Sequence, residues 1–357
     1  MPIQEIDMSF FKKDKTSDPI EGTLPYFGDQ IWIYKTFYSK ERARFELLCQ
    51  EFYRLIIPSQ PQTIIGHDKK NHSHAILSAK ISGFKPLPYH EAPLFANGTH
   101  HGLGQILVTS IFIHEIDLNL NNIGLDKNNR VVKIDGDWSA AGLIEPNLLQ
   151  GITTTITPDL IEHLPFIDHY YCYNWLDIIQ EKKNFGSSSM VDADLSKSPS
   201  FRKEINQTIL ALLLIPEFYI HAFVSHYLPN YLRHQTIEAF LSRQQELYSS
   251  AMNLDSFVNP KQTFDDFDIE AYTKHLQQFS AHLWFPVLEK NDHEKLKSAI
   301  KDRLYFINNE IHRMDSSPTS ISTLSTKANH VPHFFHHIKD DEAGNTKKGC
   351  ISIKKKI

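Results

Sequence analysis

The stretch HEIDLNLNNIGLDKNNRVVKIDGDWS, residues 114–139, decides the expected fold. Two apolar pieces flank the polar run DKNNR, a pattern that predicts a β-hairpin with a short turn. Asp117 precedes the hairpin, Asn122 stands five positions later, and Asp135 follows thirteen positions after Asn122. A hairpin holds a loop residue and a strand-end residue on one side of a rigid frame. Asn122 and Asp135 could therefore bind the same divalent metal ions through hard oxygen atoms.

Upstream of this stretch, the chain predicts a strand, a helix and two more strands. QIWIYKTF (30–37) alternates and is rich in β-branched and aromatic residues, which is typical of a strand. SKERARFELLCQEFYRLI (39–56) has apolar residues on one helical face, and Ser39 is suited to cap its N-terminus. QTIIGHD (62–68) and HAILSAKI (74–81) predict two strands joined by a polar turn.

The remaining segments favour helices. The proline- and glycine-rich segment 83–102 predicts a connecting loop, and GLGQILVTSIFIHEI (102–116) predicts a buried helix, although its β-branched run also permits a strand. Further helices are expected where apolar residues recur at helical spacing, over 165–180, 200–215, 216–228, 231–252, 268–290 and 292–314. The segments 186–200 and 259–266 predict linkers.

Composition excludes several classes of protein. The chain has 357 residues, 41% of them hydrophobic, and a formal net charge of −5, so it predicts a folded protein with no basic nucleic-acid-binding surface over its whole length. Its 3 cysteines are far apart, which supports neither a disulfide framework nor a cysteine zinc site. The N-terminal residues lack an apolar core of signal-peptide length, and the longest apolar run, 209–215, is far too short for a membrane span. A cytosolic protein is therefore expected.

Together these elements resemble the catalytic core of the protein-kinase superfamily, in which an HRDxxxxN loop precedes a hairpin that ends in the aspartate of a DFG motif. The resemblance covers about residues 20 to 145. It implies an α+β, bilobal protein-kinase-like fold, in which a small β-rich N-lobe holds one helix and a larger helical C-lobe carries a C-terminal helical extension. The expected parts are a flexible arm (1–19), the N-lobe (20–82), the C-lobe (83–250), the extension (251–314) and a mobile polar and basic tail (315–357).

The resemblance assigns catalytic roles around the hairpin. Phosphoryl transfer needs metal ions on the phosphates, a carboxylate near the acceptor hydroxyl and the exclusion of bulk water. Asp117 would act as the base or orient that hydroxyl, and Asn122 and Asp135 would bind Mg²⁺ or Mn²⁺. The simplest alternative is a plain hairpin whose polar turn residues are solvated.

The N-lobe would supply the nucleotide contacts. Lys35, at the end of IWIYK, would contact the α- and β-phosphates of ATP, and Glu46 in the following helix would fix Lys35. Glu51 is the second choice of partner, and a surface pair with Arg42 would explain Glu46 equally well. The strand 74–81 would lead into the hinge and would frame the adenine with its backbone at Ser78, Ala79, Lys80 and Ile81.

Several motifs depart from the family. Glu115-Ile116-Asp117 replaces His-Arg-Asp, and Asp135-Gly136-Asp137 replaces Asp-Phe-Gly, with Asp137 interpreted as a turn residue. The sequence also has no GxGxxG near its start and no Ala-Pro-Glu segment. The sequence therefore resembles an atypical kinase. It is similar to the kinase-like domains of effectors that intracellular bacteria of the Legionella type secrete and, more loosely, to phosphatidylinositol 4-kinases.

This resemblance implies an ATP- and metal-dependent phosphotransferase that acts on Ser or Thr of a protein, phosphorylates itself and is secreted by a bacterium into the host cytosol. One such effector kinase is switched on by a host inositol polyphosphate, so an inositol polyphosphate or an anionic phosphoinositide is an expected ligand. The alternatives are a phosphoinositide lipid kinase and an inactive pseudokinase scaffold that binds a host protein or membrane.

Overall fold

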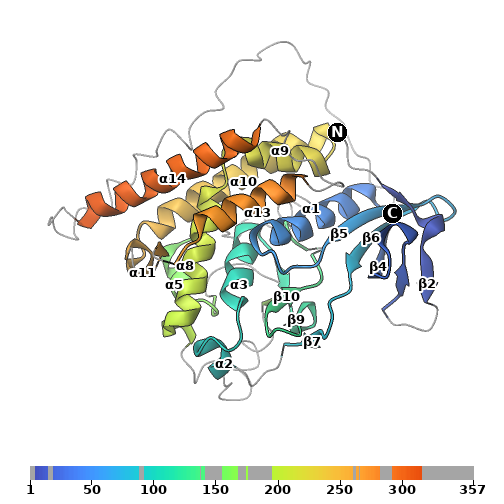
Figure 1. Cartoon of the computed structure of the whole chain (residues 1–357), viewed down its shortest axis with the longest axis horizontal. Coiled ribbons are helices and arrows are strands. Elements are labelled where there is room, and N and C mark those ends of the chain that lie inside the picture. The colour runs from blue at the N-terminus through green and yellow to red at the C-terminus, as the bar shows by residue number, and fades with distance from the viewer. Residues whose placement is uncertain are drawn as a thin grey trace, which may run out of the picture. The chain divides into compact units, whose positions relative to one another are not determined.

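In the computed structural model, the N-terminal part of the chain forms a six-stranded sheet (Figure 1). The structure describes residues 5–14, 19–87, 92–136, 138–140, 155–167, 174–175, 195–259, 263–264, 266–281 and 292–315. The strands that were expected from their alternating apolar residues are present. In spatial order the sheet consists of β1 (Ile6–Asp7), β5 (Thr63–Asp68), β6 (Ser73–Ala79), β4 (Ile31–Phe37), β3 (Glu21–Thr23) and β2 (Lys12–Asp14).

The expectation of a flexible arm over 1–19 is wrong for the residues that form β1 and β2. β1 pairs in parallel with β5, and β2 pairs antiparallel with β3. All three side chains of β2 are exposed and charged. Its sequence, KKD, therefore lacks the alternating apolar residues that predict a strand. Backbone hydrogen bonds hold this edge strand in the sheet, and local composition does not reveal them.

The rest of the described chain is mainly helical. The apolar helix α3 (Leu103–Phe112) is buried, as predicted, and packs against α8 (Pro199–Leu214). Four other helices begin and end close to predicted segments: α1 (Lys40–Ile56), α9 (Glu217–Tyr227), α10 (Asn230–Ala251) and α14 (Asp292–Asp315). α13 (Ile269–Ala281) begins where a helix was predicted, and the rest of that predicted segment lies outside the described residues. The short helices α2 (Ala92–Ala96), α5 (Pro158–Glu162) and α11 (Asp255–Val258) were not predicted.

Two segments differ from their predicted structure. The segment 83–102, expected to be a connecting loop, contains the short strand β7 (Lys85–Pro86) as well as α2. Within the helix expected over 165–180, Asn174–Trp175 is instead a strand, β11, which pairs in parallel with β8 (Asp117–Leu118). Since this pairing joins segments more than fifty residues apart, a local apolar pattern could not predict it.

The predicted hairpin is formed by β9 (Ile123–Leu125) and β10 (Val131–Lys133), which pair antiparallel. Asp126 closes the turn, because its carboxylate accepts the backbone N–H groups of Asn128 at 2.8 Å and Arg130 at 2.9 Å. Asn129 adopts a left-handed conformation with φ 59°, which asparagine tolerates better than most residues. The sequence DKNNR therefore favours this turn for local reasons.

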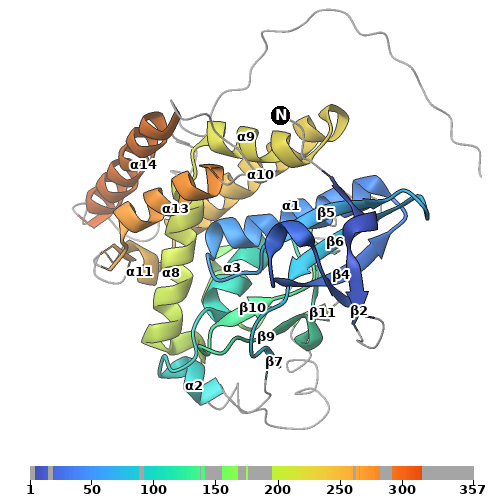
Figure 2. The same cartoon turned by 45° about the vertical axis from the view of Figure 1, so that its right-hand side comes forward.

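Helix α1 joins the sheet to the helical region. Ser39 caps its N-terminus as predicted, since Ser39 Oγ accepts the N–H of Arg42 at 3.2 Å. The helix packs against β5 and β6 and also against α3, α8 and α9 (Figures 1 and 2). Phe52 on α1 stacks on Phe112 at the end of α3, with ring centroids 5.4 Å apart. The position of α1 is thus fixed by both parts of the fold.

The described chain has an α+β, bilobal protein-kinase-like fold, with a β-rich N-lobe that holds one helix and a helical C-terminal region. Met1–Pro318 groups as one compact unit, and the second unit, Thr319–Ile357, lies outside the described residues. The lobe boundaries within the first unit stay predictions. Among the described helices, none alone is long and apolar enough to cross a membrane, although α8 and α9 pass that test as a pair bent by 85°.

Candidate active site

Lys35 lies between two carboxylates that come from different parts of the fold. Its Nζ is 2.7 Å from Oδ1 of Asp135 and 3.3 Å from Oε2 of Glu46. Glu46 is buried on α1, whereas the side chains of Lys35 and Asp135 are 35% and 30% exposed. Glu51, the second choice, instead pairs with Arg54 and accepts the N–H of Thr63 at 2.7 Å. The structure therefore brings together the three residues that the order of motifs predicted.

The hairpin places Asn122 next to the segment that carries Asp135. The N–H of Ile134 donates to the carbonyl of Asn122 at 2.9 Å, directly after the last paired residues of β9 and β10. The side-chain Nδ2 of Asn122 donates to the carbonyl of Asp117 at 3.3 Å. That bond uses the amide nitrogen, so the amide oxygen is the atom that could bind a metal ion.

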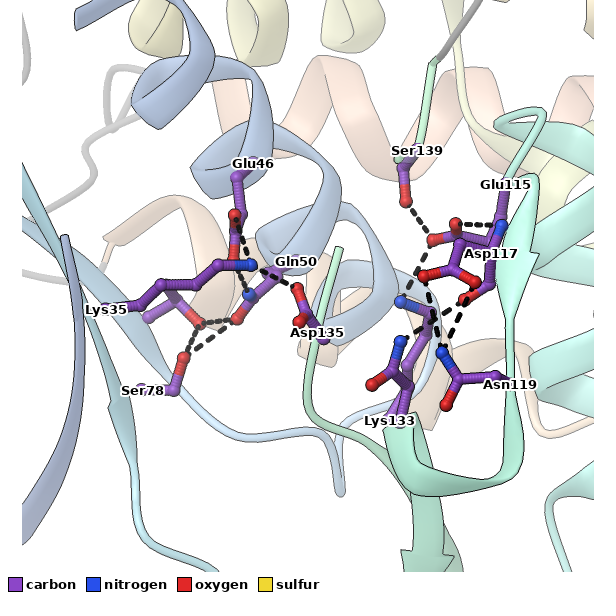
Figure 3. Close-up of polar contacts among 12 residues, drawn as sticks. Lys35, Glu46, Gln50, Ser78, Glu115, Asp117, Asn119, Lys133, Asp135 and Ser139 are labelled. Atoms are coloured by element: carbon purple, nitrogen blue, oxygen red, sulfur yellow. Dashed lines mark hydrogen bonds and ion pairs between the residues drawn. The ribbon is translucent and has the colours of Figure 1, made fainter. Parts of the chain in front are cut away.

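Asp117 is the first residue of the short strand β8, in the segment between α3 and the hairpin. Asn119 Nδ2 lies 3.3 Å from each carboxylate oxygen of Asp117, which holds this carboxylate in place (Figure 3). The backbone N–H of Asp117 donates to Oε1 of Glu115 at 3.0 Å. Asp117 is partly exposed, as a residue that meets an acceptor hydroxyl must be.

A second network lies beneath this segment and contains no predicted catalytic residue. Glu115 and Lys133 form an ion pair at 2.9 Å, with side chains only 1% and 2% exposed. Ser139 Oγ also donates to Oε2 of Glu115. Figure 3 shows this network, with Asp117 and Asn119, beside the one formed by Lys35, Glu46, Gln50, Ser78 and Asp135.

Gln50 connects the N-lobe sheet to Glu46. Its Nε2 donates to Oε1 of Glu46 at 2.7 Å, and its Oε1 accepts the hydroxyls of Thr63 at 2.8 Å and Ser78 at 2.9 Å. A Cβ built on Gly136 would lie 3.1 Å from Cγ of Gln50. This crowding gives a physical reason for glycine at the second position of Asp135-Gly136-Asp137, because a larger side chain would press on Gln50.

The sheet limits which backbone groups could make the predicted adenine contacts. Ser78 and Ala79 lie in β6, which pairs with β4 on one side and β5 on the other. The N–H of Ala79 donates to the carbonyl of Gln62 and that of Lys80 to the carbonyl of Ile31, both at 2.8 Å. Neither N–H group can therefore donate to adenine while the sheet is intact. Lys80 Nζ pairs with Glu21 at 2.7 Å. Backbone contacts with adenine through the other groups of Ser78, Ala79, Lys80 and Ile81 stay predictions.

The donor atoms of the site decide whether it can hold a metal–nucleotide complex. Among the described residues, no three His, Cys, Asp or Glu side chains gather into a metal site. A carboxylate and an amide oxygen, from Asp135 and Asn122, are nevertheless a donor pair that suits Mg²⁺ or Mn²⁺ when phosphate oxygens supply further ligands. Lys35 lies against Asp135, and an ammonium group suits phosphates. Asp135, Asn122 and Lys35 therefore suit a metal–nucleotide complex. Asp137 lies outside the described residues.

Sequence reasoning missed the residues that support the site, above all Glu115, Lys133, Ser139, Asn119 and Gln50. Glu115 was visible only as a departure from His-Arg-Asp, and Lys133 only as one polar residue in an apolar strand. Lysine at a strand position that the pattern predicts to be buried implies an acidic partner nearby. That signal could have identified the ion pair with Glu115.

Comparisons with known proteins add little to this geometry. No protein-family model matches the sequence, and no curated protein matches it. The solved structures that it matches include the crystal structure of a Helicobacter pylori proinflammatory kinase, CtkA, with 10% sequence identity and a TM-score of 0.32. That match covers 88% of this chain and 100% of the CtkA chain. At this TM-score the likeness carries no argument, so the function must be argued from the site.

Proposed function

We propose that this protein is a kinase that transfers the γ-phosphoryl group of ATP to a hydroxyl group, with Mg²⁺ or Mn²⁺ as the metal. The observation that carries the proposal is the position of Lys35, whose Nζ meets Asp135 at 2.7 Å and Glu46 at 3.3 Å. A lysine fixed by a buried helix glutamate and facing a hairpin-end aspartate is the arrangement that phosphoryl transfer from ATP uses.

Each residue has a role in this proposal. Lys35 binds phosphate oxygens, Glu46 keeps the Lys35 side chain extended, and Asp117 orients the acceptor hydroxyl and accepts its proton. Asn122 and Asp135 would hold the metal, which would neutralise charge on the phosphates. Because Lys35 and Asp135 pair directly and are partly exposed, they can exchange this contact for contacts with a nucleotide.

The acceptor and the setting are proposed from the resemblance of the sequence alone. We favour Ser or Thr of a protein as the acceptor, with autophosphorylation, because no membrane-inserting loop is evident in the sequence. The resemblance to secreted bacterial effector kinases supports action in a host cell and activation by an inositol polyphosphate. A phosphoinositide kinase and an inactive scaffold are the competing functions.

A transfer assay with radiolabelled ATP tests the proposal. We expect Mg²⁺- or Mn²⁺-dependent transfer, measured with and without inositol polyphosphates, to either a generic protein acceptor or phosphoinositide vesicles. Asp135→Ala should abolish turnover and leave the thermal unfolding midpoint unchanged, whereas Asp302→Ala, at an exposed position on α14, should keep full activity. Transfer that persists in Asp135→Ala would refute the assignment. No transfer under any condition would favour the inactive scaffold.

A further inference from the structure

The carboxylate of Glu115 joins three segments of the active site. Its Oε1 accepts the backbone N–H of Asp117 at 3.0 Å. Its Oε2 accepts a hydrogen bond from Ser139 and lies 2.9 Å from Nζ of Lys133. Lys133 precedes Asp135 by two residues, and Ser139 follows it by four. One carboxylate therefore holds the backbone of Asp117 and brackets Asp135 from both sides.

This ion pair is almost fully removed from water, with exposures of 1% for Glu115 and 2% for Lys133. Burying two charges costs so much desolvation that an apolar pair of similar volume often gives equal or greater stability. Stability alone is therefore a weak explanation for charged residues at these two positions. Hydrogen bonds are directional, so those of Glu115 and Lys133 fix the orientation of the groups that they join. An apolar pair would not fix that orientation.

The surroundings fix both partners. The side chain of Gln60 holds β10 on either side of Val132, because its Oε1 accepts the N–H of Lys133 at 2.8 Å and its Nε2 donates to the carbonyl of Val131 at 3.1 Å. The N–H of Glu115 donates to the carbonyl of Ser110 near the end of α3 at 2.8 Å. The backbone of Glu115 is thus fixed by α3, and its carboxylate is fixed by Lys133 of β10.

We propose that Glu115, together with Lys133 and Ser139, is a positioning residue that sets the carboxylate of Asp117 against that of Asp135. This inference rests on the proposed function. In that reaction Asp117 acts on the acceptor hydroxyl and Asp135 would hold the metal, so a small change in their separation would move the acceptor away from the phosphate. The Glu115 network takes the place of the histidine of the His-Arg-Asp motif, which this chain lacks.

Two variants separate positioning from stability. Ser139→Ala removes one hydrogen bond to Glu115 and leaves the ion pair in place. The double variant Glu115→Met with Lys133→Met removes both charges together, so that neither is left buried alone. Glu204→Gln is the matched control, because Glu204 is another largely buried carboxylate that accepts two backbone N–H groups, from Gly102 and Gly104, outside these loops.

We expect Ser139→Ala to keep a thermal midpoint close to that of the wild type. The double variant should lower it only by what the Ser139 hydroxyl and the Asp117 N–H lose with their acceptor. The kcat of both variants should fall by about 10- to 100-fold, and the Mg²⁺ concentration for half-maximal activity should rise, as when a residue that supports a metal ligand is lost. Backbone hydrogen exchange should become faster in 115–120 and in 134–136 and 138–140. Glu204→Gln should leave kcat, the Mg²⁺ dependence and the exchange of these segments unchanged at pH 6, although it loses one hydrogen bond because an amide nitrogen cannot accept a backbone N–H.

A double variant with the thermal midpoint and kcat of the wild type would overturn the proposal, because the ion pair would then not be needed to position the two aspartates. If the double variant does not fold, Ser139→Ala decides, and unchanged kcat and Mg²⁺ dependence would overturn the proposal. If the wild type transfers no phosphate, the proposed function fails. Hydrogen exchange then tests the positioning by itself: faster exchange of the two loops in Ser139→Ala supports it, and equal exchange overturns it.

Discussion

Gln50 illustrates how single side chains set the geometry of this site. Its amide group can take only one orientation if it is to donate to Glu46 and accept from the hydroxyls of Thr63 and Ser78. All four of these side chains are buried or nearly so, and an unpaired polar group there is costly. Gln50 therefore stabilises the N-lobe and holds Glu46 toward Lys35 at the same time.

We expect Gln50→Leu to lower the free energy of unfolding by about 1 to 3 kcal/mol, because two buried hydroxyls and Glu46 lose their partner. Urea unfolding of the purified variant would measure this loss. Adding Thr63→Val and Ser78→Ala should restore part of it, since both buried hydroxyls are then gone and only Glu46 still lacks its partner, but it should not restore phosphate transfer. A Gln50→Leu variant as stable as the wild type would contradict the hydrogen-bond network.

The residues that the sequence identified and those that it missed differ in a physical way. Lys35, Glu46, Asn122 and Asp135 could be predicted because their order along the chain follows the order of strand, helix and hairpin. Glu115 was harder to predict. Lys133 in an apolar strand indicates a buried acidic partner, but which carboxylate meets Lys133 and Ser139 depends on how the chain folds back.

Among the elements, α3 carries the loop of Asp117 and begins at an unusual cap. Its first N–H groups, those of Gly102 and Gly104, donate to the carboxylate of Glu204 on α8 at 2.8 and 3.0 Å. Gly102 has φ 92°, a conformation that favours glycine. The side chain of Glu204 is largely buried, and this burial raises its pKa to about 7 although the two N–H groups favour the charged form.

This pKa predicts how stability changes with pH. The folded chain keeps the Glu204 proton up to about pH 7, whereas the unfolded chain releases it near pH 4.5, so the contribution of Glu204 to stability falls as pH rises between these values. The loss is at most about 3 kcal/mol, less where water reaches the carboxyl. Relative to Glu204→Gln, the wild type should lose stability from pH 4.5 to 8 in urea unfolding. A constant difference would show that the pKa is not raised.

Secondary structure was predictable where a segment is amphipathic or wholly apolar over several turns, as in α1, α3 and α8. The predictions failed for β1, β2 and β11, which are two or three residues long. Strands this short contain too few side chains for an alternating pattern. Their place in the fold depends on backbone hydrogen bonds to partners elsewhere in the chain.

At the scale of the whole described unit, α1 is the element that both lobes share. Its Phe52 contacts Phe112 of α3, Phe223 of α9 and Phe240 of α10, with ring centroids 5.4, 5.7 and 5.1 Å apart. Glu46 lies on the same helix, less than two turns before Phe52. The packing of α1 on the helical region therefore determines the position of Glu46, the partner of Lys35.

This shared core predicts that the sheet and the helices unfold together. Phe223→Ala, on α9, should lower the free energy of unfolding by about 3 to 5 kcal/mol, because it leaves a cavity against Phe52. Calorimetry should still show a single transition at a lower temperature, and hydrogen exchange should become faster in α1 and β6 as well as in α9. Two separate transitions, or faster exchange confined to α9, would mean that α1 does not couple the lobes. Lys35 and Glu46 would then be held by the N-lobe alone.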